Sequence, residues 1–253
     1  MSMIFIANWK MQMPYHSAIA FYTQHSSDLQ ELSAATGSTL VLCPSFIALA
    51  PLAGMAKNSP IKLGAQHCST HAAGPYTGQI DALSLAQAGC SYALVGHSET
   101  RRLMHETSLD LIGQITQLTA NNIIPIICIG ETAAQHEAGT KREALKTQLE
   151  ALKPILTQQL STPYMIAYEP LWAIGSGITP GAADLNDIHA YLRNTITQIA
   201  IRTPQALLYG GSVNPTTIEI LASANCFDGY LIGSASLDFQ TLKKIVSWAT
   251  RVV

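Results

Sequence analysis

The sequence is poor in charge, with 12% charged residues among 253 and a formal net charge of −2. No broad basic face is therefore available for nucleic acid or an anionic membrane, and an anionic substrate would need a local site. Low-complexity tracts are also absent, and 48% of the residues are hydrophobic. A chain of this length buries roughly three quarters of its unfolded surface, so it needs neither a disulfide nor a metal to fold.

Cysteine is scarce and forms no C-x-x-C pair. The five cysteines are Cys43, Cys68, Cys90, Cys128 and Cys226. Three of them (Cys43, Cys90 and Cys128) sit in or next to apolar runs, as buried small hydrophobes do. This usage suits a reducing compartment, so we expect a cytoplasmic protein. Because the N-terminus has no charged segment and only a very short apolar run, we expect neither a signal peptide nor a membrane span.

Eight short apolar runs recur along the chain. They are Ile4–Asn8, Thr39–Cys43, Ile61–Ala65, Tyr92–Gly96, Ile124–Ile129, Tyr164–Tyr168, Ala206–Tyr209 and Tyr230–Ile232. Each is about as long as a strand, and most carry large apolar residues on both faces, as covered parallel strands do.

Helical signals fill the intervals. Thr132 and Gln135 form a capping box, and Thr179-Pro180 and Asn214-Pro215 each resemble an N-cap followed by proline at the first helical position. Apolar residues also recur at helical spacing in two segments, one with Ile112, Ile115 and Leu118, the other with Leu145, Leu149, Leu152 and Leu156. Strand–helix alternation repeated eight times in about 250 residues predicts a closed parallel barrel.

No linker interrupts this alternation, so residues 1–253 are predicted to form one α/β domain, a single (β/α)8 barrel. The alternative fold is an open doubly wound sheet. Against it, the first run ends in Asn8-Trp9-Lys10, without the G-x-G-x-x-G turn that receives a dinucleotide.

Chemically active residues follow several runs, at the strand ends where barrel active sites are built. They are Asn8, Lys10, His97, Glu169, Gly210-Gly211-Ser212 and Gly233-Ser234. Residues two apart share a strand face, so Asn8 and Lys10 should point the same way. Glycine lets backbone N–H groups approach phosphate oxygens closely, and a helix N-terminus adds a favourable dipole. We therefore expect one mouth suited to a small phosphorylated anion.

Each candidate also has a structural interpretation. A lysine near an N-terminus is usually a solvated charge, and a lone histidine after an apolar strand is more often structural than catalytic. Glu169 differs, because it leaves a buried strand and buried carboxylates are rare unless paired or functional. His67 and His71 have the i, i+4 spacing of metal ligands, but their surroundings form a glycine-containing loop with no completing ligand set. No metal is predicted.

These residues lie in short sequence motifs that closely resemble those of the triosephosphate isomerase family. The motifs are Asn8-Trp9-Lys10, Gly64-Ala65-Gln66, Tyr76-Thr77-Gly78, Gly96-His97-Ser98-Glu99, Cys128-Ile129-Gly130-Glu131, the run 167–177 (A-Y-E-P-L-W-A-I-G-S-G), the run 209–213 (Y-G-G-S-V) and the run 228–233 (D-G-Y-L-I-G). They cover essentially the whole chain in order.

The resemblance implies interconversion of glyceraldehyde 3-phosphate and dihydroxyacetone phosphate, in glycolysis and gluconeogenesis, without a cofactor. It implies Glu169 as the base and His97 as a neutral electrophile, roles that belong to the family and not to the spacing. Lys10 and Asn8 would stabilise the enediolate. The implied substrate-binding residues are Asn8, Lys10, Gly175, Ser212, Gly233 and Ser234, with Gly175 on a lid formed by Trp172–Thr179.

The sequence departs from the family at the strand-8 turn, where Ser234 replaces a common glycine. Family members also usually carry arginine and glutamate where this chain has Thr100 and Gln79, and those two residues are partners across a dimer interface. We expect a homodimer formed through the loop around His67–Gln79, with this ion pair replaced as a unit, because one lone buried charge would cost about 3–5 kcal/mol.

Two other functions compete. An aldolase or another phosphate-binding barrel enzyme is one, but an aldolase needs a Schiff-base lysine in a mid-barrel strand, and Ile124–Ile129 and Tyr164–Tyr168 carry none. The other is a non-catalytic barrel scaffold, which would be free to lose Glu169 or His97.

Overall fold

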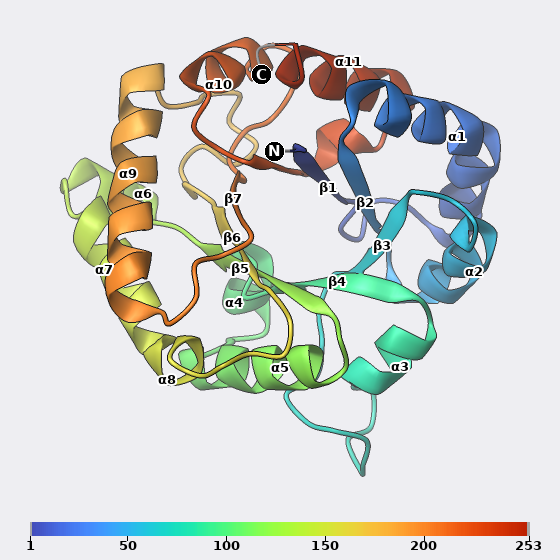
Figure 1. Ribbon diagram of the computed structural model, residues 1–253, viewed down its shortest axis with the longest axis horizontal. Helices are drawn as coiled ribbons and strands as arrows, with labels where there is room; N and C mark the ends of the chain where they lie inside the picture. Colours follow the sequence, from blue (N-terminus) through green and yellow to red (C-terminus); the bar gives the residue numbers. More distant parts are fainter. Residues whose placement is uncertain (1, 252–253) are drawn as a thin grey trace.

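Eight parallel strands close into a barrel in chain order in the computed structural model, which describes residues 2–251. The strands are β1 (Ile4–Asn8), β2 (Thr39–Cys43), β3 (Lys62–Ala65), β4 (Cys90–Val95), β5 (Ile124–Ile129), β6 (Met165–Tyr168), β7 (Ala206–Tyr209) and β8 (Gly229–Ile232). β8 pairs with β1, which closes the ring (Figure 1). The predicted (β/α)8 barrel is confirmed.

Helices surround this ring (Figure 1). They are α1 (Tyr15–Thr36), α2 (Phe46–Ala56), α3 (Ala82–Gln87), α4 (Ser98–Leu103), α5 (Ser108–Ala120), α6 (Ala133–Glu137), α7 (Lys141–Ala151), α8 (Lys153–Leu156), α9 (Ala182–Ile199), α10 (Ile218–Ala224), the 3-10 helix η1 (Ser234–Ser236) and α11 (Phe239–Ala249). Within residues 2–251, none of them combines the length and apolar character needed to cross a membrane.

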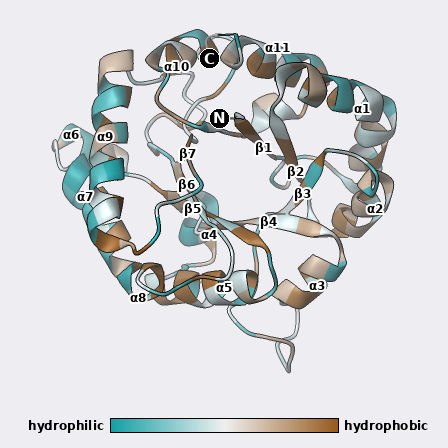
Figure 2. Cartoon of the chain, in the orientation of Figure 1, coloured by the Kyte–Doolittle hydropathy of each residue, from teal (hydrophilic) through white to brown (hydrophobic). Residues whose placement is uncertain are grey.

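Alternation along each strand divides the apolar residues between two cores. On β1, Ile4 and Ile6 point into the barrel, whereas Phe5 and Ala7 pack outward against the helices. This period of two is what a pleated strand imposes, and it explains why the runs are apolar on both faces. Hydrophobic strands with mixed helices around them are visible in Figure 2.

Several predicted boundaries are wrong by one or two residues. β3 and β6 begin one residue later than predicted, and β8 begins one residue earlier, at Gly229. β4 runs from Cys90 to Val95 instead of from Tyr92 to Gly96. Cys90 pairs with Leu63 of β3, so the polar Ser91 lies inside the strand, and Gly96 leaves it with a φ of 64°.

The structure confirms one of the predicted helix starts and contradicts two others. Thr132 and Gln135 form the predicted capping box at α6. The prediction that Thr179 caps a helix is wrong, because α9 begins at Ala182 after Gly181 and the Thr179 hydroxyl instead bonds to the Tyr209 hydroxyl at 3.1 Å.

Asn214 caps a turn and not the predicted helix start. Its Oδ1 accepts hydrogen bonds from the backbone N–H groups of Thr216 and Thr217, and α10 begins only at Ile218.

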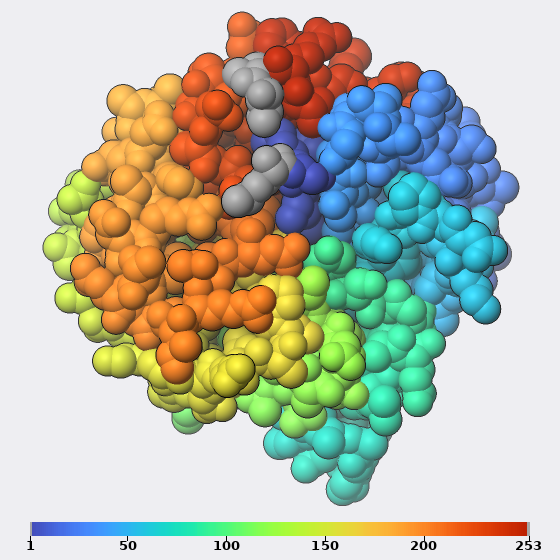
Figure 3. All heavy atoms as spheres, viewed as in Figure 1, coloured from blue at the N-terminus to red at the C-terminus, as the bar shows by residue number. Residues whose placement is uncertain are grey.

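One segment projects from the rim of the barrel. It spans residues 66–81 between β3 and α3 and forms the protrusion at the lower edge of Figures 1 and 3. Within this segment His71 stacks on Tyr76, with ring centroids 4.1 Å apart, and Tyr76 is 42% exposed.

Candidate active site

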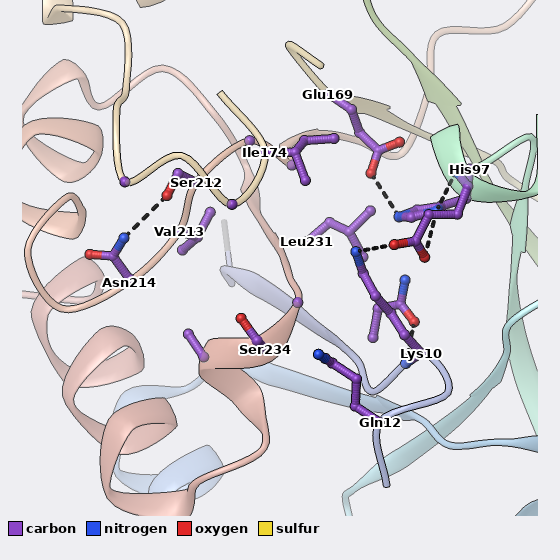
Figure 4. A pocket seen from close by; sticks show the side chains of 18 of the residues that line it. Lys10, Gln12, His97, Glu169, Ile174, Ser212, Val213, Asn214, Leu231 and Ser234 are labelled. Atoms are coloured by element: carbon purple, nitrogen blue, oxygen red, sulfur yellow. Dashed lines mark hydrogen bonds and ion pairs between the residues drawn. The ribbon is translucent and has the colours of Figure 1, made fainter. Parts of the chain in front are cut away.

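A cavity of about 630 Å³ opens at the carboxyl ends of the strands. Among its lining residues are all eight site candidates from the sequence, namely Asn8, Lys10, His97, Glu169, Gly175, Ser212, Gly233 and Ser234. His97 and Glu169 stand on one side, and Ser212 and Ser234 lie across the opening from His97 (Figure 4).

Glu169 and His97 are in direct contact. Glu169 Oε1 lies 3.1 Å from His97 Nε2, and its Oε2 accepts a hydrogen bond from the Ser98 backbone N–H at 3.3 Å. Both side chains are almost fully buried, 3% and 6% exposed. Buried ionisable groups that face a cavity are the usual components of proton-transfer sites.

The backbone of β5 and β6 fixes the position of Glu169. Its N–H donates to Ile129 O at 2.7 Å, which extends the strand ladder by one residue. Gly130 follows Ile129, and a Cβ there would lie only 1.7 Å from the Glu169 carbonyl oxygen. Only glycine allows the two chains to approach so closely.

The tautomer of neutral His97 follows from its neighbour. Nδ1 accepts a hydrogen bond from the Glu99 backbone N–H at 3.2 Å, so the ring proton resides on Nε2. Gly96 supplies the positive φ at which the chain turns from β4 toward the cavity. Nε2 therefore presents a hydrogen-bond donor to the site.

Burial lowers the pKa of His97, but the charge of Glu169 and its hydrogen bond raise it more, so the net shift is upward. Lys10 opposes this change because it is a cation. The elevated pKa depends on Glu169 remaining in contact with the imidazole.

Lys10 has a left-handed backbone, with a φ of 52°. Because β1 ends at Asn8, the prediction that Lys10 and Asn8 share a strand face is wrong. Both residues nevertheless line the cavity. Its N–H donates to Asn8 Oδ1 at 3.0 Å and its carbonyl accepts from Gln66 Nε2 at 2.8 Å. Such strain persists only where neighbours fix it.

Two residues without a predicted role, Glu99 and Gln66, contact Lys10. Glu99 Oε1 lies 2.9 Å from Lys10 Nζ and orients the ammonium, and the Lys10 side chain as a whole is 20% exposed. Gln66 Nε2 also donates to Cys43 O at 2.9 Å and so ties together the ends of β1 and β2. Their presence in motifs shared with the family was the only signal in the sequence, since both are far from Lys10 along the chain.

The glycine and serine turns form the opposite rim. Ser212 Oγ accepts from Asn214 Nδ2 at 3.2 Å. Ser234 begins η1 and has no positive φ, so this turn tolerates serine in place of glycine. A Cβ on Gly233 would lie 3.6 Å from Lys10 Cε, which places that turn beside the lysine.

The segment Trp172–Thr179 contributes Ile174, Gly175 and Gly177 to the cavity lining. Gly175 and Gly177 have positive φ values of 68° and 76°, and Gly175 lines the cavity. Trp172 Nε1 donates to Glu131 Oε1 at 2.8 Å at one end, and Thr179 meets Tyr209 at the other.

The two histidines with metal-ligand spacing have other contacts. His67 Nε2 lies 3.0 Å from Glu106 Oε1, while His71 stacks on Tyr76. Across residues 2–251, His, Cys, Asp and Glu side chains form no group of three or more suited to a metal ion.

Comparison with known proteins gives one family. The family model described as triosephosphate isomerase matches residues 3–249. The triosephosphate isomerase of Moorella thermoacetica is 36% identical over 248 residues, which cover 97% of this chain and 98% of that protein. The enzyme of Cupriavidus necator is 37% identical, with 92% and 93% of the two chains covered.

A solved structure agrees. The crystal structure of triosephosphate isomerase from Bartonella henselae matches with a TM-score of 0.80 at 27% identity and covers 99% of this chain and 100% of that one. With the barrel, the cavity and matches along nearly its full length, this chain belongs to the triosephosphate isomerase family.

Proposed function

We propose that this protein interconverts glyceraldehyde 3-phosphate and dihydroxyacetone phosphate with Glu169 as the base and His97 as the electrophile. Family membership supplies the reaction. The contact between Glu169 Oε1 and His97 Nε2 at 3.1 Å, at the edge of the cavity, is the observation that supports the residue assignment.

Glu169 removes a proton from the carbon next to the carbonyl and returns it to the former carbonyl carbon through an enediolate, while the hydroxyl proton passes from one enediolate oxygen to the other by way of His97 Nε2. General bases of this kind contribute about 10²–10⁴-fold in rate. Glu169 must leave His97 to reach the substrate. Because the carboxylate is what raises the His97 pKa, its departure favours the neutral imidazole with its proton on Nε2.

Charge that develops on the enediolate oxygens requires donors that are already in place. His97 Nε2 and Lys10 Nζ supply two, and the Asn8 amide NH2 group supplies a third because its oxygen is occupied by Lys10 N–H. Each such donor is worth on the order of 3 kcal/mol in a site of this kind.

The phosphoryl group binds at the glycine and serine rim. Ser212 and Ser234 lie across the cavity from the catalytic pair, and Gly233 precedes Ser234 and lines the same cavity, so a triose would reach from one side to the other (Figure 4). Gly175 joins them from the lid Trp172–Thr179. Closure of that lid excludes water and holds the enediolate until the proton returns.

A coupled assay tests this function. We expect isomerisation in both directions without added metal or cofactor, and competitive inhibition by 2-phosphoglycolate, which carries a phosphoryl group and a carboxylate. Absence of activity in the purified, folded protein would support the scaffold interpretation instead.

The proposed assembly is a homodimer that packs through the projecting segment 66–81. Tyr76 within this segment is exposed, as is Met104, which lines one pocket together with residues of the segment, and the exposed Leu83 follows at the start of α3. Exposed apolar side chains that gather in one region are typical of a protein–protein interface.

The replaced ion pair gives a test of the dimer. Thr100 and Gln79 are both uncharged, so the replacement leaves no buried charge without a partner, and Thr100 Oγ1 donates within its own chain to His97 O at 2.9 Å. We expect sedimentation at micromolar concentration to give a dimer. Exclusive monomer would contradict retention of the interface.

Residues 1–253 are proposed to act as one domain. All five cysteines are free and four are buried, in keeping with a reducing compartment, so the proposed location is the cytoplasm.

A further inference from the structure

One hydrogen bond in the candidate site joins a proposed phosphate ligand to a residue without an assigned role. Ser212 is 7% exposed and lines the cavity, as does Asn214 two residues later. Within residues 2–251, the only hydrogen bond of Ser212 Oγ is with Asn214 Nδ2, at 3.2 Å (Figure 4). The hydrogen-bonding state of this hydroxyl group therefore depends on Asn214.

The backbone determines which end of the Asn214 amide faces Ser212. Asn214 Oδ1 lies 2.8 Å from the backbone nitrogen of Thr216 and 3.1 Å from that of Thr217. Backbone N–H groups only donate, so the amide oxygen must be the atom that meets them. The NH2 group consequently faces Ser212, and because it also only donates, Ser212 Oγ is the acceptor in this bond.

The proton of the Ser212 hydroxyl remains available to a ligand. A serine hydroxyl has one proton to donate and two lone pairs that accept. Asn214 uses one lone pair, and no group within residues 2–251 accepts the proton. A phosphoryl group offers strong acceptor oxygens, so one that binds at this rim can receive that proton.

The turn that follows Ser212 fixes the two side chains relative to each other. Thr217, which is 3% exposed, donates through Oγ1 to Ser212 O at 2.7 Å and accepts from Asn214 N at 3.1 Å. Pro215, between them, has a restricted φ. Little conformational freedom is therefore lost when the site binds a ligand, which favours affinity.

We propose that Asn214 is a positioning residue for phosphate recognition. Its amide occupies a lone pair of Ser212 Oγ and so keeps the hydroxyl proton available for the phosphoryl group. A hydroxyl that already accepts a hydrogen bond is also a stronger donor, because successive hydrogen bonds polarise one another. This role rests on the proposed function, in which Ser212 is a phosphate ligand.

A double-mutant cycle tests whether Asn214 acts through Ser212. Calorimetric titration gives the Kd of 2-phosphoglycolate for the wild type, Ser212→Ala, Asn214→Ala and the double variant. We expect Ser212→Ala to weaken binding by about 10- to 100-fold, the usual loss for one hydrogen bond to a charged group. Asn214→Ala should weaken it by about three- to tenfold, within the range of coupling between groups in contact.

In the Ser212→Ala background, Asn214→Ala should change the Kd by less than about twofold, because no hydroxyl is left to orient. If Asn214 only stabilised the turn, its removal would weaken binding equally with and without the hydroxyl. Equal losses in the two backgrounds would therefore overturn the positioning role.

Asn214→Asp tests the same idea with the turn preserved. The carboxylate still accepts from the backbone N–H groups of Thr216 and Thr217, but an oxygen replaces Nδ2 and takes the Ser212 proton for itself. We expect binding of 2-phosphoglycolate to weaken by about 10- to 100-fold, as in Ser212→Ala.

Thr216→Asp separates this effect from simple repulsion, because it adds the same charge at an exposed position two residues away. Solvent screens such a charge, so we expect a loss of about threefold or less. If Asn214→Asp weakened binding no more than Thr216→Asp does, the proposal would be wrong.

Asn186→Ala is the matched truncation at an exposed asparagine of α9 and should bind as the wild type does. Circular dichroism checks that every variant is folded. A wild type that binds 2-phosphoglycolate, combined with additive losses in the cycle, overturns the role of Asn214 alone. A folded wild type that fails to bind it overturns the proposed function and this role together.

Discussion

Glu169→Asp should reduce turnover by about 100-fold or more while the barrel stays folded. The substitution keeps the carboxylate but withdraws it by one methylene, and a displacement of ~1 Å in a reacting group costs about that much in rate. The residue sits at the end of a strand ladder, with its N–H bonded to Ile129 O, so the backbone cannot follow the shortened side chain. Steady-state kinetics in the coupled assay measure the loss.

Glu219→Asp makes the same change at an exposed position of α10 and should leave turnover unaltered. Circular dichroism and 2-phosphoglycolate binding establish that Glu169→Asp retains its fold and its phosphate site. Near-normal turnover in Glu169→Asp would exclude Glu169 as the base.

Lys10→Ala should raise KM and lower kcat together, with kcat reduced by about 10²–10³-fold, the usual loss for one preorganised donor. Lys10 Nζ lies beside the Gly233 turn and is oriented by Glu99, so it can attract the phosphoryl group and also stabilise oxygen charge in the enediolate. Kinetics with both triose phosphates measure the two parameters.

Lys62→Ala provides the comparison, because Lys62 is an exposed lysine at the opposite, amino-terminal end of β3. It should change neither parameter. If Lys10→Ala altered only thermal stability, Lys10 would be an ordinary surface charge.

The barrel was predictable because its strands are covered on both faces and so appear as apolar runs. Errors in the boundaries arose where the neighbouring strand determines the extent. Gly229 was left out of the predicted last strand, yet it pairs with Ile4, and a Cβ there would lie 1.9 Å from the Ile4 carbonyl oxygen. Close packing of two backbones requires glycine inside a strand, and no local pattern reveals it.

The residues of the candidate site were predictable as a set, because the carboxyl ends of parallel strands meet at one face of a barrel. Their orientation was not. The left-handed backbone of Lys10 depends on Gln66, which is 56 residues away in the sequence, and Thr179 was assigned to a helix cap although Tyr209 claims its hydroxyl. Local sequence preferences cannot predict hydrogen-bond partners that only the folded chain brings together.

The hydrogen bond from the Glu99 backbone to His97 Nδ1 has a consequence for synthetic ligands. Because Nδ1 accepts that bond, the neutral imidazole carries its proton on Nε2 and presents only a hydrogen-bond donor to the cavity. A compound that points an amine or hydroxyl hydrogen at Nε2 is repelled by the proton on Nε2, whereas a carbonyl, hydroxamate or sulfonyl oxygen accepts a hydrogen bond from it. Selective blockers of this enzyme are therefore best built as rigid oxygen acceptors joined to an anionic tail.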